Sequence, residues 1–322
     1  MKVAVLRECL RSNWSFVHDI DATFKDAHDA NMEFFAWDEQ PQQEFDFYDV
    51  SEMFHDRSIK YIKEKKRVVV TTEEPSVIST LKYLNERGQN LENIINKPIH
   101  YIARTTWSRD TLLQLGVDGE KISLIPFGVN TSKFQPRNLK REFPFPTFLY
   151  VGSVSRIKGV DILLRSFKQV GKGHLLVVAG QFNNDEVLLN QLNQTPNVHV
   201  KSWRNDIEYY FNQADIYVQP QSYGNPMNGG ILHFGRPLQW AVSSGLPILS
   251  LNQGAARDFI VQGRNGFLCN YADAMTDYMN QLSDNPEVVK QMGYYSRAFA
   301  KDYCSSAMVG SLYNAVYKVL AK

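Results

Sequence analysis

The sequence predicts an α/β protein built on parallel β-sheets. Five apolar runs in its second half alternate with amphipathic stretches typical of helices, which is the pattern of parallel βαβ units. These runs cover residues 147–151, 175–180, 198–200, 214–220 and 246–251. Ligands of such sheets bind at the carboxyl ends of the strands. The turns that follow these runs are therefore the first candidates for a functional site.

A second set of strands is expected in the first half of the chain. The runs cover residues 2–6, 33–37, 67–72, 98–103 and 121–126. Between the two sets lies PRNLKREFPFP, residues 136–146, whose prolines and charges predict a linker. We therefore expect two domains, residues 1–143 and 144–306, followed by a terminal helix over residues 307–320.

Composition excludes several classes of protein. The 322 residues are 43% hydrophobic and 21% charged, as in ordinary globular chains, and the net charge of +1 argues against a nucleic-acid-binding protein. Cys9, Cys269 and Cys304 are far apart and lack metal-ligand spacing, which favours free thiols in a reduced cytoplasm. No secretory signal and no membrane-spanning stretch is expected.

One basic segment, RSIKYIKEKKR between Arg57 and Arg67, has two interpretations. A basic amphipathic helix can lie on an anionic membrane surface, which would make the protein membrane-peripheral. The same pattern also fits a solvated helix face that precedes a buried strand. We favour the solvated helix.

The turn VGSVSRIKG, residues 151–159, joins a predicted strand to a predicted helix. The amino end of a helix carries free N–H groups and partial positive charge, and Arg156 and Lys158 add full charges. This arrangement predicts an anion site with a diphosphate as its occupant. An ordinary turn with two solvated cations has the same pattern.

The segments VGSVSRIKGVDILLRSF, ADIYVQP, SSGLPILS and GRNGFL resemble, in order and spacing, the landmarks of the retaining glycosyltransferases of family 4. Residues 102–136 are similar to the end of that family's N-terminal domain. The resemblance covers about residues 102–268 and is weak before residue 97. It implies the GT-B fold: two Rossmann-like domains whose parallel sheets face a cleft, with the C-terminal helix crossing back to the first domain.

The resemblance also implies a reaction. It indicates transfer of a sugar from a UDP- or GDP-linked donor to an acceptor that is a glycan, a lipid-linked molecule or a protein. The family retains the anomeric configuration, needs neither metal nor cofactor, and neutralises the leaving diphosphate with fixed cations. The leaving phosphate oxygen helps to deprotonate the acceptor, so no protein nucleophile is expected. The first domain would bind the acceptor and the second the nucleotide sugar.

Several donor-binding residues follow from the resemblance. Lys158 falls on the family's lysine, and its side chain is expected to be exposed in the open cleft. Ser153 stands where the family has arginine, and Arg156 is the candidate replacement. Gly152 and Gly180 end two of the predicted strands. Trp203 is a candidate to pack on the nucleobase, or is a core or rim aromatic.

The chain departs from the family at two glutamates, whose positions are taken by Leu232 and Trp240. Amides after the strand over residues 214–220 are candidates to bond sugar hydroxyls, and glycines there to approach phosphate. The candidates are Asn225, Asn228, Gly229, Gly230 and His233. We expect this loop to line the donor pocket and to be mobile when empty; a plain loop of turn residues is the alternative.

Three further interpretations complete the sequence analysis. Glu73 and Glu74 are candidates for the acceptor side or for a helix cap. His174 and His199, like the other histidines outside the 225–233 loop, show no pairing pattern and are assigned no role. The loss of both glutamates also fits a non-catalytic GT-B protein that binds a nucleotide or a partner enzyme without turnover.

Overall fold

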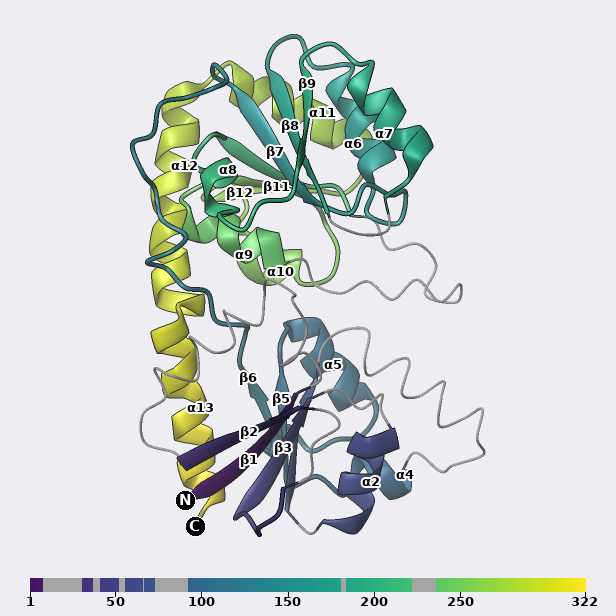
Figure 1. Cartoon of the computed structure of the whole chain (residues 1–322), viewed down its shortest axis with the longest axis vertical. Coiled ribbons are helices and arrows are strands. Elements are labelled where there is room, and N and C mark those ends of the chain that lie inside the picture. The colour runs from purple at the N-terminus through teal and green to yellow at the C-terminus, as the bar shows by residue number, and fades with distance from the viewer. Residues whose placement is uncertain are drawn as a thin grey trace. The chain divides into compact units, whose positions relative to one another are not determined.

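The computed structural model describes residues 1–7, 31–36, 41–51, 56–65, 67–72, 92–180, 184–221 and 236–322. These residues form two compact units, each with a parallel six-stranded sheet (Figure 1). The first unit holds the described residues up to Gly128 and those from Cys304 onward, and the second holds those from Val129 to Tyr303. The predicted α/β architecture with two parallel sheets is confirmed.

The first sheet has the strand order β2-β1-β3-β4-β5-β6, and all of its neighbouring strands are parallel. Its strands are β1 (Lys2–Arg7), β2 (Asn31–Ala36), β3 (Phe47–Ser51), β4 (Val68–Thr72), β5 (His100–Ala103) and β6 (Ile122–Leu124). Its helices are α2 (Asp56–Glu64), α4 (Glu92–Ile95), α5 (Thr106–Gln114) and α13 (Ser306–Leu320), and a 3₁₀ turn covers Gly119–Lys121.

The C-terminal helix α13 packs on one face of this first sheet. Alternate residues of a strand point to opposite faces, and Val3 and Val5 of β1 share a buried cluster with Val309, Tyr313 and Tyr317 of α13. A second cluster covers the other face of the sheet with residues from α2, α4 and α5. The expected return of the terminal helix to the first domain is therefore confirmed.

The basic segment forms helix α2 and packs into the core of the first unit. Ile59 and Ile62 are 5% and 2% exposed, whereas Lys60 and Lys63 face solvent. The apolar stripe is therefore occupied by protein and is not free to enter a lipid surface. In the part of the chain that the structure describes, no helix is long and apolar enough to cross a membrane.

The second sheet has the strand order β12-β11-β10-β7-β8-β9, again all parallel. Its strands are β7 (Thr147–Gly152), β8 (His174–Ala179), β9 (Val198–Ser202), β10 (Ile216–Gln219), β11 (Ile248–Leu251) and β12 (Gly266–Cys269). Its helices are α6 (Val160–Phe167), α7 (Glu186–Asn193), α8 (Glu208–Phe211), α9 (Arg236–Ser243), α10 (Ala256–Phe259), α11 (Ala272–Ser283) and α12 (Pro286–Phe299), and a π-helical turn covers Ala300–Cys304.

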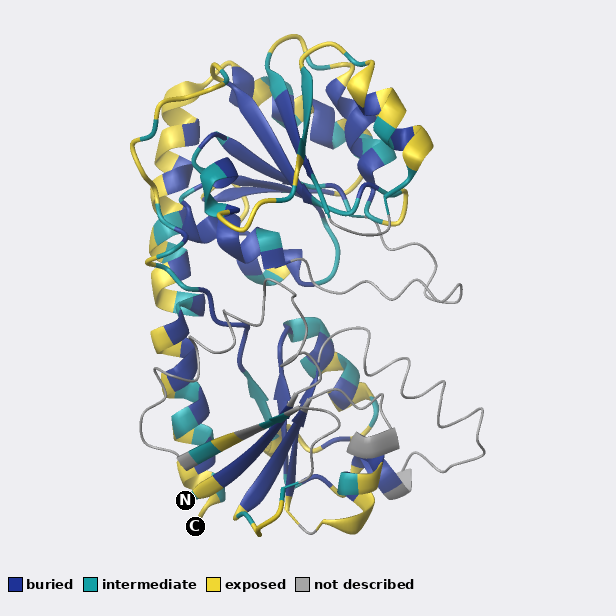
Figure 2. Cartoon of the chain, viewed as in Figure 1, coloured by how far each residue is buried: buried dark blue, intermediate teal, exposed yellow. Residues whose placement is uncertain are grey.

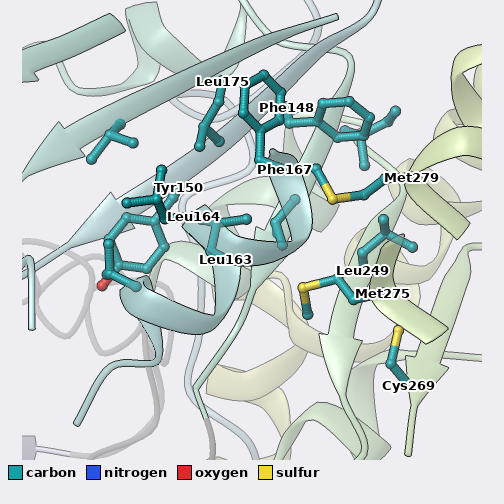
Figure 3. Packing of buried hydrophobic residues seen from close by; sticks show 14 of the residues in the cluster. Phe148, Tyr150, Leu163, Leu164, Phe167, Leu175, Leu249, Cys269, Met275 and Met279 are labelled. Atoms are coloured by element: carbon teal, nitrogen blue, oxygen red, sulfur yellow. The ribbon is translucent and has the colours of Figure 1, made fainter. Parts of the chain in front are cut away.

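Helices α6 and α11 cover one face of this sheet and bury a large apolar cluster. Phe148 of β7, Leu163 and Phe167 of α6, and Met275 and Met279 of α11 meet there (Figure 3). The central strands are buried along almost their whole length (Figure 2). This explains why they read as continuous apolar runs and not as alternating patterns.

The proline-rich segment after residue 135 is attached to the second unit. Arg141 donates two hydrogen bonds of 2.8 Å to the carboxylate of Asp215, and Gln213 accepts from the Glu142 N–H at 2.7 Å. The units change between Gly128 and Val129, whereas the sequence places the change at residues 143/144. Composition shows the prolines but not these side-chain contacts, which join residues about 70 positions apart.

Two histidines that the sequence left without a role form a pair. His174 begins β8, His199 lies on the adjacent β9, and their Nδ1 and Nε2 atoms are 3.0 Å apart. The ring of Phe143 stacks on His199 at 4.4 Å. Burial, then the nearby His174, then the charge of Lys201 lower the pKa of His199. The pairing could not be read from the sequence because it depends on strand adjacency.

This pair is expected to make stability depend on pH. Because the pKa of His199 is lower in the folded chain, the unfolded chain binds a proton at this histidine more tightly than the folded chain does. The free energy of unfolding should therefore fall as pH drops through the ordinary histidine range. Urea unfolding at pH 7.5 and 5.5 should show a smaller fall for His199→Gln than for the wild type, and equal falls would contradict the assignment.

Candidate functional site

The turn predicted to bind an anion lies at a reversal in the strand order of the second sheet. Strands β7 and β10 are neighbours, but β8 and β9 extend the sheet beyond β7, while β11 and β12 extend it beyond β10. Open α/β sheets bind ligands outside the carboxyl ends of the strands at such a switch point. The turn of residues 153–159 leaves β7 there, and Pro220 and Gln221 leave β10.

Gly159 brings this turn into direct contact with the end of β10. Its φ is +73°, and a Cβ placed on it would lie 2.0 Å from the carbonyl oxygen of Pro220. Only glycine fits both the left-handed conformation and the close approach. Gly159 is also the N-cap of α6, so the same contact fixes where the helix begins.

Hydrogen bonds hold the rest of the turn in place. The hydroxyl of Tyr150 donates to the carbonyl of Ser153 at 2.8 Å. The N–H of Val154 donates to the side-chain oxygen of Asn184, which in turn donates from Nδ2 to the carbonyl of Gly180. Asn184 thus joins the turn after β7 to the loop after β8. A turn fixed in this way loses little freedom when a ligand binds.

Gly180 and Gly152 let the two strand ends approach each other. The Gly180 N–H donates to the Gly152 carbonyl at 2.8 Å. A Cβ on Gly180 would lie 3.0 Å from the backbone nitrogen of Ser153. These three residues, all candidates from the sequence, therefore lie together at the carboxyl edge of the sheet.

Lys158 is half-buried in this turn and not exposed as the sequence predicts. Burial lowers the pKa of its ammonium group. Among the residues that the structure describes, no carboxylate forms an ion pair with it. The sequence could not show this burial, because the pattern of a turn does not tell how far its side chains are covered by distant parts of the chain. An unpaired, partly desolvated cation is a strong site for an anionic ligand.

Two further features add positive potential. Arg156 is exposed, and within the described part of the chain no carboxylate pairs with it. Helix α6 begins at Val160, and its N-cap Gly159 provides no side-chain cap. The Val160 N–H donates to the Ser155 carbonyl at 3.2 Å, so the partial positive charge of the helix start rests on the next N–H groups of the first turn. Asp161 in that first turn offsets part of this charge. The turn retains two cations and a helix amino end, which suits a diphosphate.

The two tryptophans of this unit have different surroundings. Trp203 follows β9 and is half-buried, with its ring centroid 6.3 Å from that of Trp240. Trp240 on α9 is 2% exposed and stacks on Phe134 at 4.9 Å with an interplanar angle of 4°. Trp240 is therefore a core residue of the second unit.

Several sequence candidates lie outside the described residues: Glu73, Glu74, Asn225, Asn228, Gly229, Gly230, Leu232 and His233. Their roles stay predictions. Conversely, the sequence did not identify Tyr150, Asn184 or Pro220, which shape the anion turn. No local signal marks Asn184 and Pro220, because each acts through a contact with a residue at another strand end. Tyr150 bonds within its own strand end, and the sequence shows it only as part of an apolar run.

Comparison with known families gives a direct match. Residues 132–299, more than half of the chain, match the family described as "Glycosyl transferases group 1". A Haemophilus influenzae protein named as an uncharacterized glycosyltransferase is 28% identical over 184 residues, 54% of this chain and 50% of its own length. The capsular polysaccharide biosynthesis glycosyltransferase CapM of Staphylococcus aureus is 25% identical over 222 residues, 63% of this chain and 56% of its own length. The chain thus spans about half the length of these relatives.

Solved structures share the fold over the whole chain. HepE of Anabaena, solved with UDP, has a TM-score of 0.77 and 15% identity, covering 99% of this chain and 100% of its own. Sucrose-phosphate synthase of Thermosynechococcus elongatus has a TM-score of 0.75 and 14% identity, covering 99% of both chains. These neighbours confirm the expected GT-B fold.

Proposed function

Because the chain belongs to the group 1 glycosyl transferases, we propose that it transfers a sugar from a nucleotide diphosphate sugar to an acceptor. The observation that carries the proposal is Lys158, which is half-buried and has no carboxylate partner among the described residues. It lies beside the start of α6, which has no side-chain cap, at the switch point of the second sheet. A site of this kind stabilises the negative charge that develops on a departing diphosphate.

UDP is the first donor nucleotide that we propose. HepE, which shares the fold, was solved with UDP and with UDP-glucose. The proposed site binds the diphosphate through Lys158 and Arg156, with Trp203 at the nucleobase end. The remaining donor contacts are proposed to come from the loop with Asn225 and Asn228, for which sugar hydroxyls are the ligands.

The proposed reaction retains the configuration of the transferred sugar, as in glycosyltransferase family 4. The fixed cations neutralise the leaving group, so the proposal assigns no metal and no cofactor. The leaving phosphate oxygen accepts the proton of the acceptor hydroxyl as the new glycosidic bond forms. Two features of the site fit this scheme. The turn offers cations to the diphosphate, and Trp240, which aligns with one of the family's glutamates, is packed in the core and offers no carboxylate.

A thermal-shift series with UDP, GDP and their glucose conjugates tests the proposal, followed by a hydrolysis and transfer assay with each nucleotide that binds. A ligand that binds the native state raises the melting temperature by mass action. Binding with turnover supports the transferase. Binding of a nucleotide without turnover of any nucleotide sugar would instead support a non-catalytic protein, which the packed Trp240 also fits. No shift with any nucleotide would contradict both.

Arg156 is expected to supply the charge that Ser153 lacks. Arg156→Ala should weaken UDP binding about tenfold, the loss of one charge-assisted hydrogen bond. Adding Ser153→Arg to this variant should restore part of the affinity, because it returns a cation to the same strand end. Calorimetric titration of both variants with UDP measures the effect. Arg165→Ala, on the exposed side of α6, is the matched control and should bind like the wild type.

A further inference from the structure

A buried arginine lies at the carboxyl edge of the first sheet, in the other unit. Arg104 directly follows β5 and is 5% exposed. One terminal nitrogen, Nη1, donates to the carbonyl of Pro126 at 3.2 Å and lies 3.5 Å from that of Ile125. The guanidinium is thus held on the backbone that follows β6.

The other edge of the guanidinium has no hydrogen-bond acceptor among the residues that the structure describes. Nε is sealed from solvent and has no hydrogen-bond acceptor. Nη2 has no acceptor among the described residues either, yet it is not among the fully sealed polar atoms. Within that same part of the chain no carboxylate forms an ion pair with Arg104. A desolvated cation without a counter-charge is costly to the fold.

Two aromatic rings contact the guanidinium, and its Nε–Nη2 edge is left without a hydrogen-bond acceptor among the described residues. The rings of Phe127 and Tyr313 lie 4.4 Å and 5.3 Å from Cζ, both within the range of cation–π contact. Arg104 is followed by Thr105, the N-cap of helix α5, and the helix itself starts at Thr106. Its first turn contains no acidic residue. The helix amino end therefore adds partial positive charge with no acid to offset it.

We propose that Arg104 binds an anionic group of the acceptor, a carboxylate or a phosphate ester, through the Nε–Nη2 edge. Two parallel N–H donors in a rigid plane match two oxygens of such a group. Arg104 is 5% exposed, and a low-dielectric surrounding of this kind strengthens the pairing. Only the identification of the ligand as the acceptor rests on the proposed function; the anion site itself does not.

A purely structural role makes a different prediction from a binding role. Holding the carbonyls of Ile125 and Pro126 needs Nη1 alone, and this bond is made without any ligand. Arg104→Lys keeps a positive charge near these carbonyls but loses the planar two-donor edge. Arg104→Gln removes the charge as well. The lysine variant therefore separates anion recognition from support of the backbone.

Hydrogen exchange locates the site without an activity assay. The full chain is incubated with glycerol 3-phosphate, with glucuronate, or with glucose as the neutral control, at equal ionic strength. We expect one of the two anions to slow exchange in peptides that cover β5, residues 125–127 and α13, and glucose to have no effect. Protection by the phosphate identifies a phosphate ester, and protection by the glucuronate identifies a carboxylate.

The variants then test the assigned residue. Arg104→Lys should weaken binding of the anion that slows exchange by about tenfold or more, because a bidentate charged contact is lost. If Arg104→Gln does not fold, Arg104→Lys still provides the test of anion binding. Arg109→Gln is the matched control, because Arg109 lies on α5, is half-exposed and is already paired with Asp110. Equal protection in Arg104→Lys and wild type, or no protection by either anion, would overturn the proposal.

UDP added to the same samples separates this proposal from the proposed function. UDP is expected to protect peptides of residues 152–160 in wild type and in Arg104→Lys alike. Anion protection in the first unit without any UDP binding would support the Arg104 site and contradict the transferase. UDP binding without anion protection would contradict the Arg104 site alone.

Discussion

Replacing Lys158 with methionine is expected to weaken UDP binding by on the order of 1.5–3 kcal/mol, the range of a hydrogen bond to a charged group. Without ligand, the same change should raise the melting temperature. Methionine keeps an unbranched apolar stem of similar length, so packing is preserved. It removes an ammonium group that is half-buried and has no carboxylate partner among the described residues.

The stability part of this prediction has a defined pH dependence. Burial lowers the pKa of Lys158, so at neutral pH the folded chain holds a proton less tightly than the unfolded chain does. The gain in stability from Lys158→Met should therefore be largest at neutral pH. It should shrink as pH rises through the folded-state pKa toward the ordinary lysine range, because the native lysine then becomes neutral.

Calorimetric titration with UDP and thermal unfolding at two pH values measure both effects. Lys168→Met is the control, because Lys168 is exposed at the end of α6 and should change neither quantity. Unchanged UDP affinity in Lys158→Met would remove Lys158 from the donor site. A lower melting temperature without ligand would show that the ammonium has a favourable partner in the native state.

The strands of this protein were predictable where they were apolar and continuous. Two strands of the sheets were missed, β3 and β12. Strand β3 carries Asp49, which is fully buried and accepts hydrogen bonds from Thr71 and Tyr317. A carboxylate normally argues against a buried strand. The hydrogen-bond donors that stabilise the buried carboxylate come from β4 and α13. They are distant in the sequence, so no local pattern around Asp49 predicts them.

The candidate site was predictable in its charge and glycines but not in its packing. The spacing of Arg156, Lys158 and Gly159 between a strand and a helix is a local signal, and the structure places it at the switch point. The anchoring by Asn184 depends on a neighbouring strand end, and the burial of Lys158 on packing that the turn itself does not encode. Such contacts join distant residues, so a single sequence does not contain a pattern for them.

Gly159→Ala is expected to cost about 2–4 kcal/mol of stability and to weaken UDP binding as well. About 1 kcal/mol comes from holding alanine in the left-handed region at φ +73°. A further 1–3 kcal/mol comes from overpacking, since the new methyl group would meet the Pro220 carbonyl oxygen at 2.0 Å. Because the atoms that the methyl group would meet belong to the backbone of Pro220 and Gln221, the turn or the end of β10 must move.

The chain provides a matched control that separates these two costs. Gly263 has nearly the same φ, +72°, but nothing lies within 4 Å of the position that its Cβ would occupy. Gly263→Ala should therefore show only the conformational cost of about 1 kcal/mol and bind UDP like the wild type. Urea unfolding and UDP titration of both variants measure the difference. If the two alanines cost the same, the turn does not rest on the end of β10. If Gly159→Ala is destabilised but binds UDP normally, the position of the turn does not matter for the diphosphate, and the donor site lies elsewhere.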